Sequence, residues 1–87
     1  RYDLHIQESK KQAVIQACKD NAYSAFGAYK IQSTEAIDGF KFYFDDDRWV
    51  MIRPSGTEAV LRVYAQAPTA EEVIKILEAT KEEVLSS

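Results

Sequence analysis

The sequence predicts an α+β domain in which a four-stranded antiparallel sheet carries two helices packed mainly on one face. Two segments, one near each end of the chain, repeat apolar residues at the spacing of an amphipathic helix. The segment between them alternates apolar and polar residues as β-strands do, and turn signals such as Asp38-Gly39 interrupt it. The 87 residues suffice for a single domain with a modest core.

The two predicted helices flank the strands in the sequence. The first covers residues 7–21, and its apolar positions are Val14, Cys18 and Ala22. The lysines of this helix are assigned to its polar face: Lys10, Lys11 and Lys19. The second helix begins after Pro68, where Thr69 and Glu72 make a capping box. The apolar face of the second helix consists of Val73, Ile76, Leu77, Thr80 and Val84.

Four strands are predicted, at residues 29–33, 40–44, 49–53 and 60–66. In the middle hairpin we expect Phe42 opposite Ile52, and in the last hairpin Ile52 opposite Val63. These registers place one apolar set on the face that the helices cover: Phe40, Phe42, Phe44, Val50, Ile52, Leu61, Val63 and Ala65. The other face carries Tyr43, Trp49, Met51 and Tyr64, which we interpret as a surface for another domain.

The register of the last hairpin also sets two positive charges side by side. It places Arg53 directly across from Arg62, about 5 Å apart on the face away from the helices. Like charges in that arrangement destabilise a hairpin. A domain tolerates such a pair more readily when an anion regularly lies between the two side chains.

The loop between these arginines, within RPSGTEAVLR, combines groups that bind phosphate. Guanidinium groups match phosphate oxygens with forked donors, and the hydroxyls of Ser55 and Thr57 add further donors. Gly56 permits unusual backbone conformations and, without a Cβ, lets an anion approach closely. The alternative is an ordinary turn with two solvated arginines, because Ser-Gly-Thr is common in turns. The loop is not a P-loop, since GxxxxGK[ST] is absent.

The segment RPSGTE (residues 53–58), followed by LRVY (residues 61–64), closely resembles the phosphate-binding loop of the α-D-phosphohexomutases. Phosphoglucomutases and phosphomannomutases belong to this superfamily. The resemblance covers the whole chain and implies that residues 1–87 are the C-terminal, fourth domain of a longer multidomain enzyme. That domain is an antiparallel sheet flanked by helices, which agrees with the predicted fold.

The resemblance also implies a function. Members of the superfamily interconvert hexose 1-phosphate and hexose 6-phosphate through a phosphoserine and a bisphosphorylated intermediate. The phosphoserine, the Mg²⁺-binding aspartates and the sugar-reading loop belong to the other domains, so this chain alone is expected to be inactive, with no catalytic residue and no metal ligand of its own. On the same pattern, the contacts to the substrate phosphate map onto Arg53, Ser55, Gly56, Thr57 and Arg62. Which hexose is accepted stays open, because the sugar-reading loop lies elsewhere.

One residue departs from the pattern of the superfamily. Members often have proline after the Thr-Glu pair, whereas this chain has Ala59. The change removes no donor, but it is expected to loosen the end of the loop. Glu58 is expected to brace either the loop or an arginine.

Other residues that suggest chemistry are assigned structural roles. Asp45, Asp46 and Asp47 are consecutive at a predicted turn and lack the spacing of a calcium loop, so a solvated turn is favoured over a metal site. His5 has no evident acid or base partner in sequence. Cys18, the single cysteine, is assigned to the core, and its being alone fits a reducing, cytoplasmic setting.

Composition narrows the partners. The net charge of −3 argues against a nucleic-acid surface, and no apolar run approaches the roughly 20 residues of a membrane span. The expected partners are a phosphorylated hexose and the other domains of the parent enzyme. One alternative is a stand-alone module that binds RNA or a partner peptide through its aromatic strands, with Phe40, Phe42, Phe44 and Trp49. A further alternative, a hydrolase with Ser55 as nucleophile, has no base near the serine in sequence.

Overall fold

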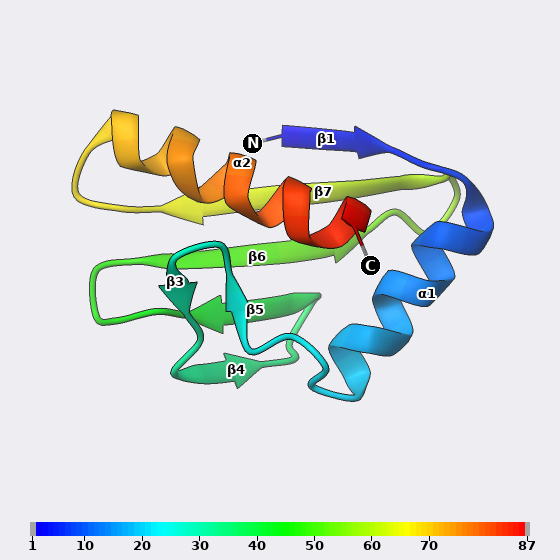
Figure 1. Ribbon diagram of the computed structural model, residues 1–87. Coiled ribbons are helices and arrows are strands. Elements are labelled where there is room, and N and C mark those ends of the chain that lie inside the picture. Colours follow the sequence, from blue (N-terminus) through cyan, green and yellow to red (C-terminus); the bar gives the residue numbers. More distant parts are fainter. Residues whose placement is uncertain (1, 87) are drawn as a thin grey trace.

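The computed structural model describes residues 2–86 as an α+β domain (Figure 1). Its elements are β1 (Tyr2–His5), α1 (Glu8–Lys19), β2 (Ala25–Phe26), β3 (Tyr29–Lys30), β4 (Ser33–Glu35), β5 (Phe40–Tyr43), β6 (Trp49–Pro54), β7 (Val60–Gln66) and α2 (Ala70–Ser86). Five strands form one antiparallel sheet in the order β1-β7-β6-β5-β4, and β2 and β3 form a separate hairpin. The predicted fold class is confirmed, but the sheet has five strands rather than four.

In the main sheet, the strand that was not predicted from the sequence is β1, at the edge beside β7. Tyr2, Asp3 and Leu4 pair with Val63, Arg62 and Leu61, and Leu4 is buried in the core. Its four residues alternate, but the segment is short and has only one neighbouring strand. Such a weak local pattern becomes a strand because pairing with β7 buries Leu4.

We expected a single strand at residues 29–33, but this segment passes from the small hairpin to the main sheet. Tyr29 pairs with Phe26 in the small hairpin, and Ser33 pairs with Tyr43 in the main sheet. Between them, the Ile31 amide donates to the Ser24 carbonyl at 3.0 Å and the Gln32 amide to the Tyr43 carbonyl at 2.8 Å. The chain changes partner here because the small hairpin inserts Phe26 into the core, where this residue is fully buried.

The register of the middle hairpin differs from the prediction by two residues, with Phe42 opposite Val50 and Phe40 opposite Ile52. The turn decides this shift. The Asp45 carboxylate accepts the Asp47 amide at 2.9 Å and the Arg48 guanidinium at 3.0 Å, so the turn closes one residue earlier than expected. A shift of two residues leaves every side chain on its predicted face. In the last hairpin, Ile52 opposite Val63 is confirmed.

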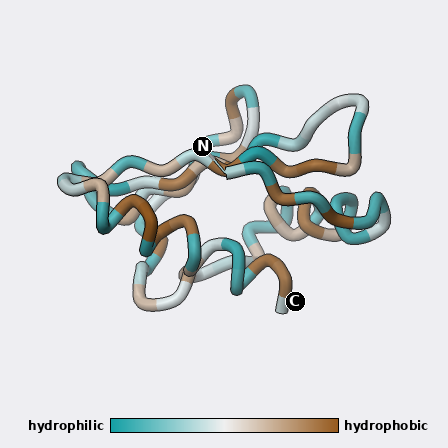
Figure 2. Tube along the Cα trace, turned by 90° about the horizontal axis from the view of Figure 1, so that it is seen from above, coloured by the Kyte–Doolittle hydropathy of each residue, from teal (hydrophilic) through white to brown (hydrophobic). Residues whose placement is uncertain are grey.

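Both helices lie on the same side of the sheet, as Figure 2 shows. The core fills the space between helices, small hairpin and sheet. Its buried apolar residues are Leu4, Val14, Cys18, Phe26, Phe42, Phe44, Val50, Ile52, Leu61, Val63, Ile76 and Val84. The predicted core face and the assignment of Cys18 to the core are confirmed, with Phe40 and Ala65 packed at its margin. Burial raises the pKa of the Cys18 thiol to about 12, so this thiol stays protonated.

The predicted capping box of α2 is half formed. The Thr69 hydroxyl accepts the Glu72 amide at 3.1 Å, but the Glu72 carboxylate pairs with Arg48 Nε at 2.9 Å instead of returning to Thr69. Tyr29 donates its hydroxyl to the same carboxylate at 3.4 Å. Glu72 therefore ties the start of α2 to the β5–β6 turn and to β3. Within residues 2–86, no helix is both long enough and apolar enough to cross a membrane.

Replacing Phe26 with alanine is expected to destabilise the protein by about 3–5 kcal/mol, because the ring lies 5.1 Å from that of Phe42 and is fully buried. Urea denaturation followed by circular dichroism measures the loss. The exposed Ile37→Ala serves as the control. A loss below about 1 kcal/mol would mean that the small hairpin is not part of the core.

Acid is expected to weaken the contacts of Arg48. Its hydrogen bond lowers the pKa of Glu72 from the ordinary 4.5, and the Asp47 amide, with Arg48, lowers the pKa of Asp45 from 3.8. Both groups have a lower pKa in the folded than in the unfolded chain, so their stabilisation is complete above about pH 5 and is lost as the pH falls through the lowered values.

The comparison is the melting temperature of the wild type and of Arg48→Met at pH 7 and pH 3. We expect the variant to lose less stability on acidification than the wild type. The control is Lys75→Met, which breaks an exposed pair with Glu71 at 4.0 Å. Equal losses in wild type and Arg48→Met would contradict the assignment.

Candidate functional site

The site predicted from the sequence is the loop that joins β6 to β7. β6 ends at Pro54 and β7 begins at Val60, and the Ser55 amide donates to the Val60 carbonyl at 3.0 Å to close the loop. The apolar alternation of the two strands sets their register. The register in turn fixes which side chains flank the loop.

Arg53 and Arg62 are direct cross-strand partners, as expected. They lie on the sheet face away from the helices, because their neighbours Ile52 and Val63 face the core. Arg53 is exposed and Arg62 is half-buried. Arg62 Nε is buried and has no hydrogen-bond partner among the described residues. A buried guanidinium nitrogen without a partner is costly, and an acceptor that arrives from outside the domain would remove that cost.

β1 adds a third charge to this row. Asp3 is the cross-strand partner of Arg62 on its other side, so the open face reads Arg53, Arg62, Asp3 across three strands. The carboxylate offsets one of the two positive charges and leaves a net positive pair of arginines at the edge of the loop. Sequence reasoning did not find Asp3 because it did not find β1. The same strand brings His5, which is exposed, beside Val60.

Ser55 organises the loop from within. Its side chain is 6% exposed, and its Oγ accepts the amides of Thr57 at 3.4 Å and of Glu58 at 3.2 Å. These two amides therefore converge on the serine oxygen rather than on a ligand position outside the loop. The hydroxyl proton of Ser55 is not used in these bonds, since the oxygen is the acceptor in both. Bracing by backbone amides gives no activation of Ser55 as a nucleophile.

Gly56 is placed for access rather than for unusual backbone angles. Its φ is not in the left-handed region, which among the described glycines is used by Gly27 and Gly39. A Cβ built on Gly56 would meet nothing within 4 Å. The expected open approach to the backbone is therefore present, whereas the expected conformational need is not. Thr57 is exposed at the tip.

Lys11 reaches the loop from α1 and was not predicted to do so. The residue is 6% exposed, and its Nζ donates to the Glu58 carbonyl at 3.0 Å and lies 3.6 Å from the Glu8 carboxylate. We placed it on the solvated face of the helix, which is wrong. The signal was present in the sequence, since Lys11 precedes Val14 and Cys18 by three and seven residues and so shares their buried face.

The loop is also fixed at its exit. The Ile6 amide, just after β1, donates to the Ala59 carbonyl at 3.1 Å. Glu58 braces the loop through its backbone, with its amide on Ser55 and its carbonyl on Lys11. The loosening that we expected from alanine at position 59 is therefore offset by bonds from two other elements.

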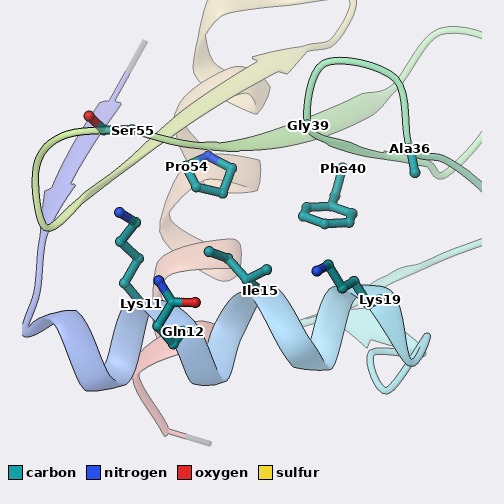
Figure 3. Close-up of a pocket in the computed structure, with 10 residues that line it drawn as sticks. Lys11, Gln12, Ile15, Lys19, Ala36, Gly39, Phe40, Pro54 and Ser55 are labelled. Carbon is teal, nitrogen blue, oxygen red and sulfur yellow. The ribbon is translucent and has the colours of Figure 1, made fainter.

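An open cavity of about 600 Å³ lies between α1 and the sheet, with the start of the β6–β7 loop at one end (Figure 3). Ser55 and Gly56 belong to its wall, together with Lys11, Gln12, Ile15, Lys19, Ala36, Gly39, Phe40 and Pro54. Arg53, Thr57 and Arg62 do not line it. The structure therefore brings the two arginines together on one face and sets Ser55 and Gly56 between that face and the cavity.

No metal centre is formed by the residues described. Residues 2–86 contain no group of three or more His, Cys, Asp or Glu side chains able to hold a metal ion. In the run at residues 45–47, Asp45 is occupied by the Asp47 amide and by Arg48.

Comparison with known proteins identifies the family. The model of the family "Phosphoglucomutase/phosphomannomutase, C-terminal domain" matches residues 5–83. The chain belongs to this family. The resemblance noted in the loop is thus confirmed over nearly the whole chain.

Individual relatives are sugar-phosphate mutases. A probable phosphoglucosamine mutase of Methanosphaera stadtmanae is 37% identical over 76 residues, 87% of this chain and 16% of the relative. A phosphoglucomutase/phosphomannomutase of Thermococcus kodakarensis is 34% identical over 85% of this chain and 15% of its own. A phosphopentomutase of the same organism is 48% identical over 46% of this chain and 9% of its own. The chain spans about a sixth of the length of the first of these relatives.

Replacing Ser55 with alanine is expected to release the amides of Thr57 and Glu58 and to cost about 1–2 kcal/mol, as the loss of a helix cap does. Hydrogen exchange of the Glu58 amide should accelerate in this variant. Ser55→Thr retains the hydroxyl and should protect the amide, and the exposed Ser33→Ala is the surface control. An equally protected Glu58 amide in Ser55→Ala would contradict the role assigned to the serine.

Proposed function

We propose that this chain is the C-terminal phosphate-binding domain of a larger sugar-phosphate mutase, and that its β6–β7 loop holds the phosphate that is not reacting. The residues proposed to bind that phosphate are Arg53, Ser55, Gly56, Thr57 and Arg62. The observation that carries the proposal is the cross-strand pair Arg53–Arg62, with Arg62 Nε buried and without a partner in the described residues.

Electrostatics favour an anion at this place. Two guanidiniums on facing strands repel, and Asp3 offsets one of the two charges. A phosphate dianion between the arginines would relieve the repulsion and supply acceptors for forked donors. The free hydroxyl proton of Ser55 and the open backbone at Gly56 would complete such a site at the start of the loop.

The proposed role in the reaction is to orient the substrate. A clamp on the distant phosphate contributes binding energy that positions the reacting end without taking part in the chemistry. The parent enzyme is proposed to be an isomerase that interconverts hexose 1-phosphate and hexose 6-phosphate. Its phosphoserine and its Mg²⁺ site are placed in other domains, which are the proposed partners of this one. Alone, the chain is proposed to bind phosphate and to be inactive.

A clamp that contacts only phosphate suits more than one sugar. The relatives named above include a phosphoglucosamine mutase and a phosphopentomutase. Hexose phosphates remain our main proposal. A pentose phosphate is the second candidate, and the similarity to the phosphopentomutase favours it.

Burial of aromatic rings weighs against binding of RNA or a peptide through the strands. Phe42 and Phe44 are 2% and 5% exposed and pack under the helices. Phe40 is half-buried at the cavity, which leaves Trp49 on the open face. Trp49 is itself covered by the Lys41 ammonium at 4.1 Å. Two of the four rings on which this alternative depends, Phe42 and Phe44, are therefore buried and cannot stack on bases.

The test is a titration of the ¹⁵N-labelled chain with glucose 6-phosphate, with glucose as the control ligand. We expect shifts of the amides of residues 53–59 with the phosphate ester and not with glucose. Arg62→Met should weaken binding roughly tenfold or more, because it removes a charged hydrogen-bond donor. Lys75→Met, a charge loss far from the loop in sequence, should bind as the wild type does.

Two outcomes would contradict this proposal. One is the absence of shifts at millimolar glucose 6-phosphate, and the other is equal binding by Arg62→Met and wild type. Single-stranded RNA at low salt is titrated in parallel. Shifts confined to Trp49 and its neighbours with RNA would favour the binding-module alternative.

A further inference from the structure

The peptide that joins Glu58 to Ala59 is held in one orientation by a buried lysine. Lys11 is a charged residue with 6% exposure, and its ammonium donates to the Glu58 carbonyl at 3.0 Å. Burying an ammonium is unfavourable, and a lysine near the N-terminal end of α1 also meets the positive end of the helix dipole. An apolar side chain would hold α1 against the sheet without either cost. We therefore infer that the buried ammonium has a role in the loop that an apolar side chain could not fill.

The orientation of the carbonyl fixes the direction of the next amide. The described residues contain no cis peptide bond, and in a planar trans peptide the C=O and N–H point in opposite directions. The Glu58 carbonyl points to Lys11, on the side of α1 and the core. The Ala59 N–H consequently points away from Lys11 and α1.

The same amide has no partner among the described residues, whereas its neighbours do. The amides of Thr57 and Glu58 donate to Ser55, and the Ser55 amide donates to the Val60 carbonyl. The Ala59 carbonyl accepts from Ile6, which fixes the far side of the residue as well. Ala59 is thus held on both sides while its N–H remains free to donate.

We propose that the Ala59 N–H is an additional donor to the bound phosphate, and that Lys11 is the positioning residue that aims it. The proposal rests on the proposed function of the loop and adds one backbone donor that side-chain patterns do not reveal. Without Lys11, the Glu58 carbonyl could turn outward and present a partial negative charge to the anion. With Lys11 in place, the same peptide presents its N–H.

The experiment uses the 87-residue chain, ¹⁵N-labelled, with inorganic phosphate and then glucose 6-phosphate as ligands. In the wild type, the Ala59 amide proton should move downfield on saturation with either ligand. Ala59→Pro deletes the N–H and should raise the dissociation constant roughly tenfold, as expected for one hydrogen bond to a charged group. Ala59→Gly keeps the N–H and should bind within about twofold of the wild type.

A double-mutant cycle separates aiming from folding. Lys11→Met keeps an unbranched apolar stem but removes the ammonium. With Ala59 present, this change should weaken phosphate binding. In the Ala59→Pro background the same change should have a smaller effect, because the donor that Lys11 aims is already absent. Lys11→Arg, which retains a donor, should restore most of the affinity of Lys11→Met.

The failures of the two proposals can be told apart. If the wild type binds neither ligand, the phosphate-binding function is wrong. If the wild type binds but the Ala59 amide does not shift and Ala59→Pro binds equally well, the function stands and this inference is overturned. If Ala59→Pro does not fold, the amide shift in the wild type and the comparison of Lys11→Met with Lys11→Arg still decide. If the effects of Lys11→Met and Ala59→Pro on the binding free energy are additive, Lys11 does not orient the Ala59 N–H, and the positioning role proposed for Lys11 is overturned.

Discussion

The antiparallel register of β6 and β7 is the constraint on which the site depends. Ile52 must face Val63 in the core, because a slip of one residue would turn the apolar side chains of the slipped strand to the open face. Once that pairing is fixed, Arg53 and Arg62 are necessarily cross-strand neighbours on the opposite face. The hydrophobic effect thus holds two like charges together, and burial of the core outweighs the repulsion that remains beside Asp3.

The buried polar side chains also stabilise the β6–β7 loop. Among the described residues, the buried polar or charged ones are Lys11, Ser55 and Thr80. The Thr80 hydroxyl donates to the Ile76 carbonyl at 2.8 Å, so its hydrogen bond stays within α2. Lys11 and Ser55 instead bind opposite ends of the same residue, Glu58. Two of the three buried polar residues therefore hold the short loop at residues 55–59. Burying polar groups is costly, so their concentration at this loop supports a ligand-binding role for it.

Periodicity in the sequence was enough to predict the helices, the core face and the last hairpin, since each rests on a repeated pattern of burial. It was not enough for β1 or the β2–β3 hairpin, which have only two to four residues per strand. β1 forms because it pairs with the distant β7, and the hairpin is held because Phe26 is buried in the core. The two-residue error in the middle hairpin came from the turn, where the Asp45 and Arg48 side chains set the closure. In the site, the arginine pair followed from register, whereas Lys11 and Asp3 required the positions of α1 and β1. A polar residue on an apolar stripe, as Lys11 is, was the one signal of this kind that the sequence offered.

The contacts of the loop also bear on how the proposed domain would move. Residues 58 and 59 are bonded by side chains or amides from Ser55, from α1 and from the chain after β1. A loop tied to three elements has little freedom to close over a ligand by itself, since each hinge would break at least one of these bonds. If the proposed phosphate site has to meet a reacting group held by another part of the parent enzyme, the domain must therefore approach as one rigid body. The clamp would then arrive with its donors already in place, and the ordering cost of the loop would be borne on folding rather than on binding.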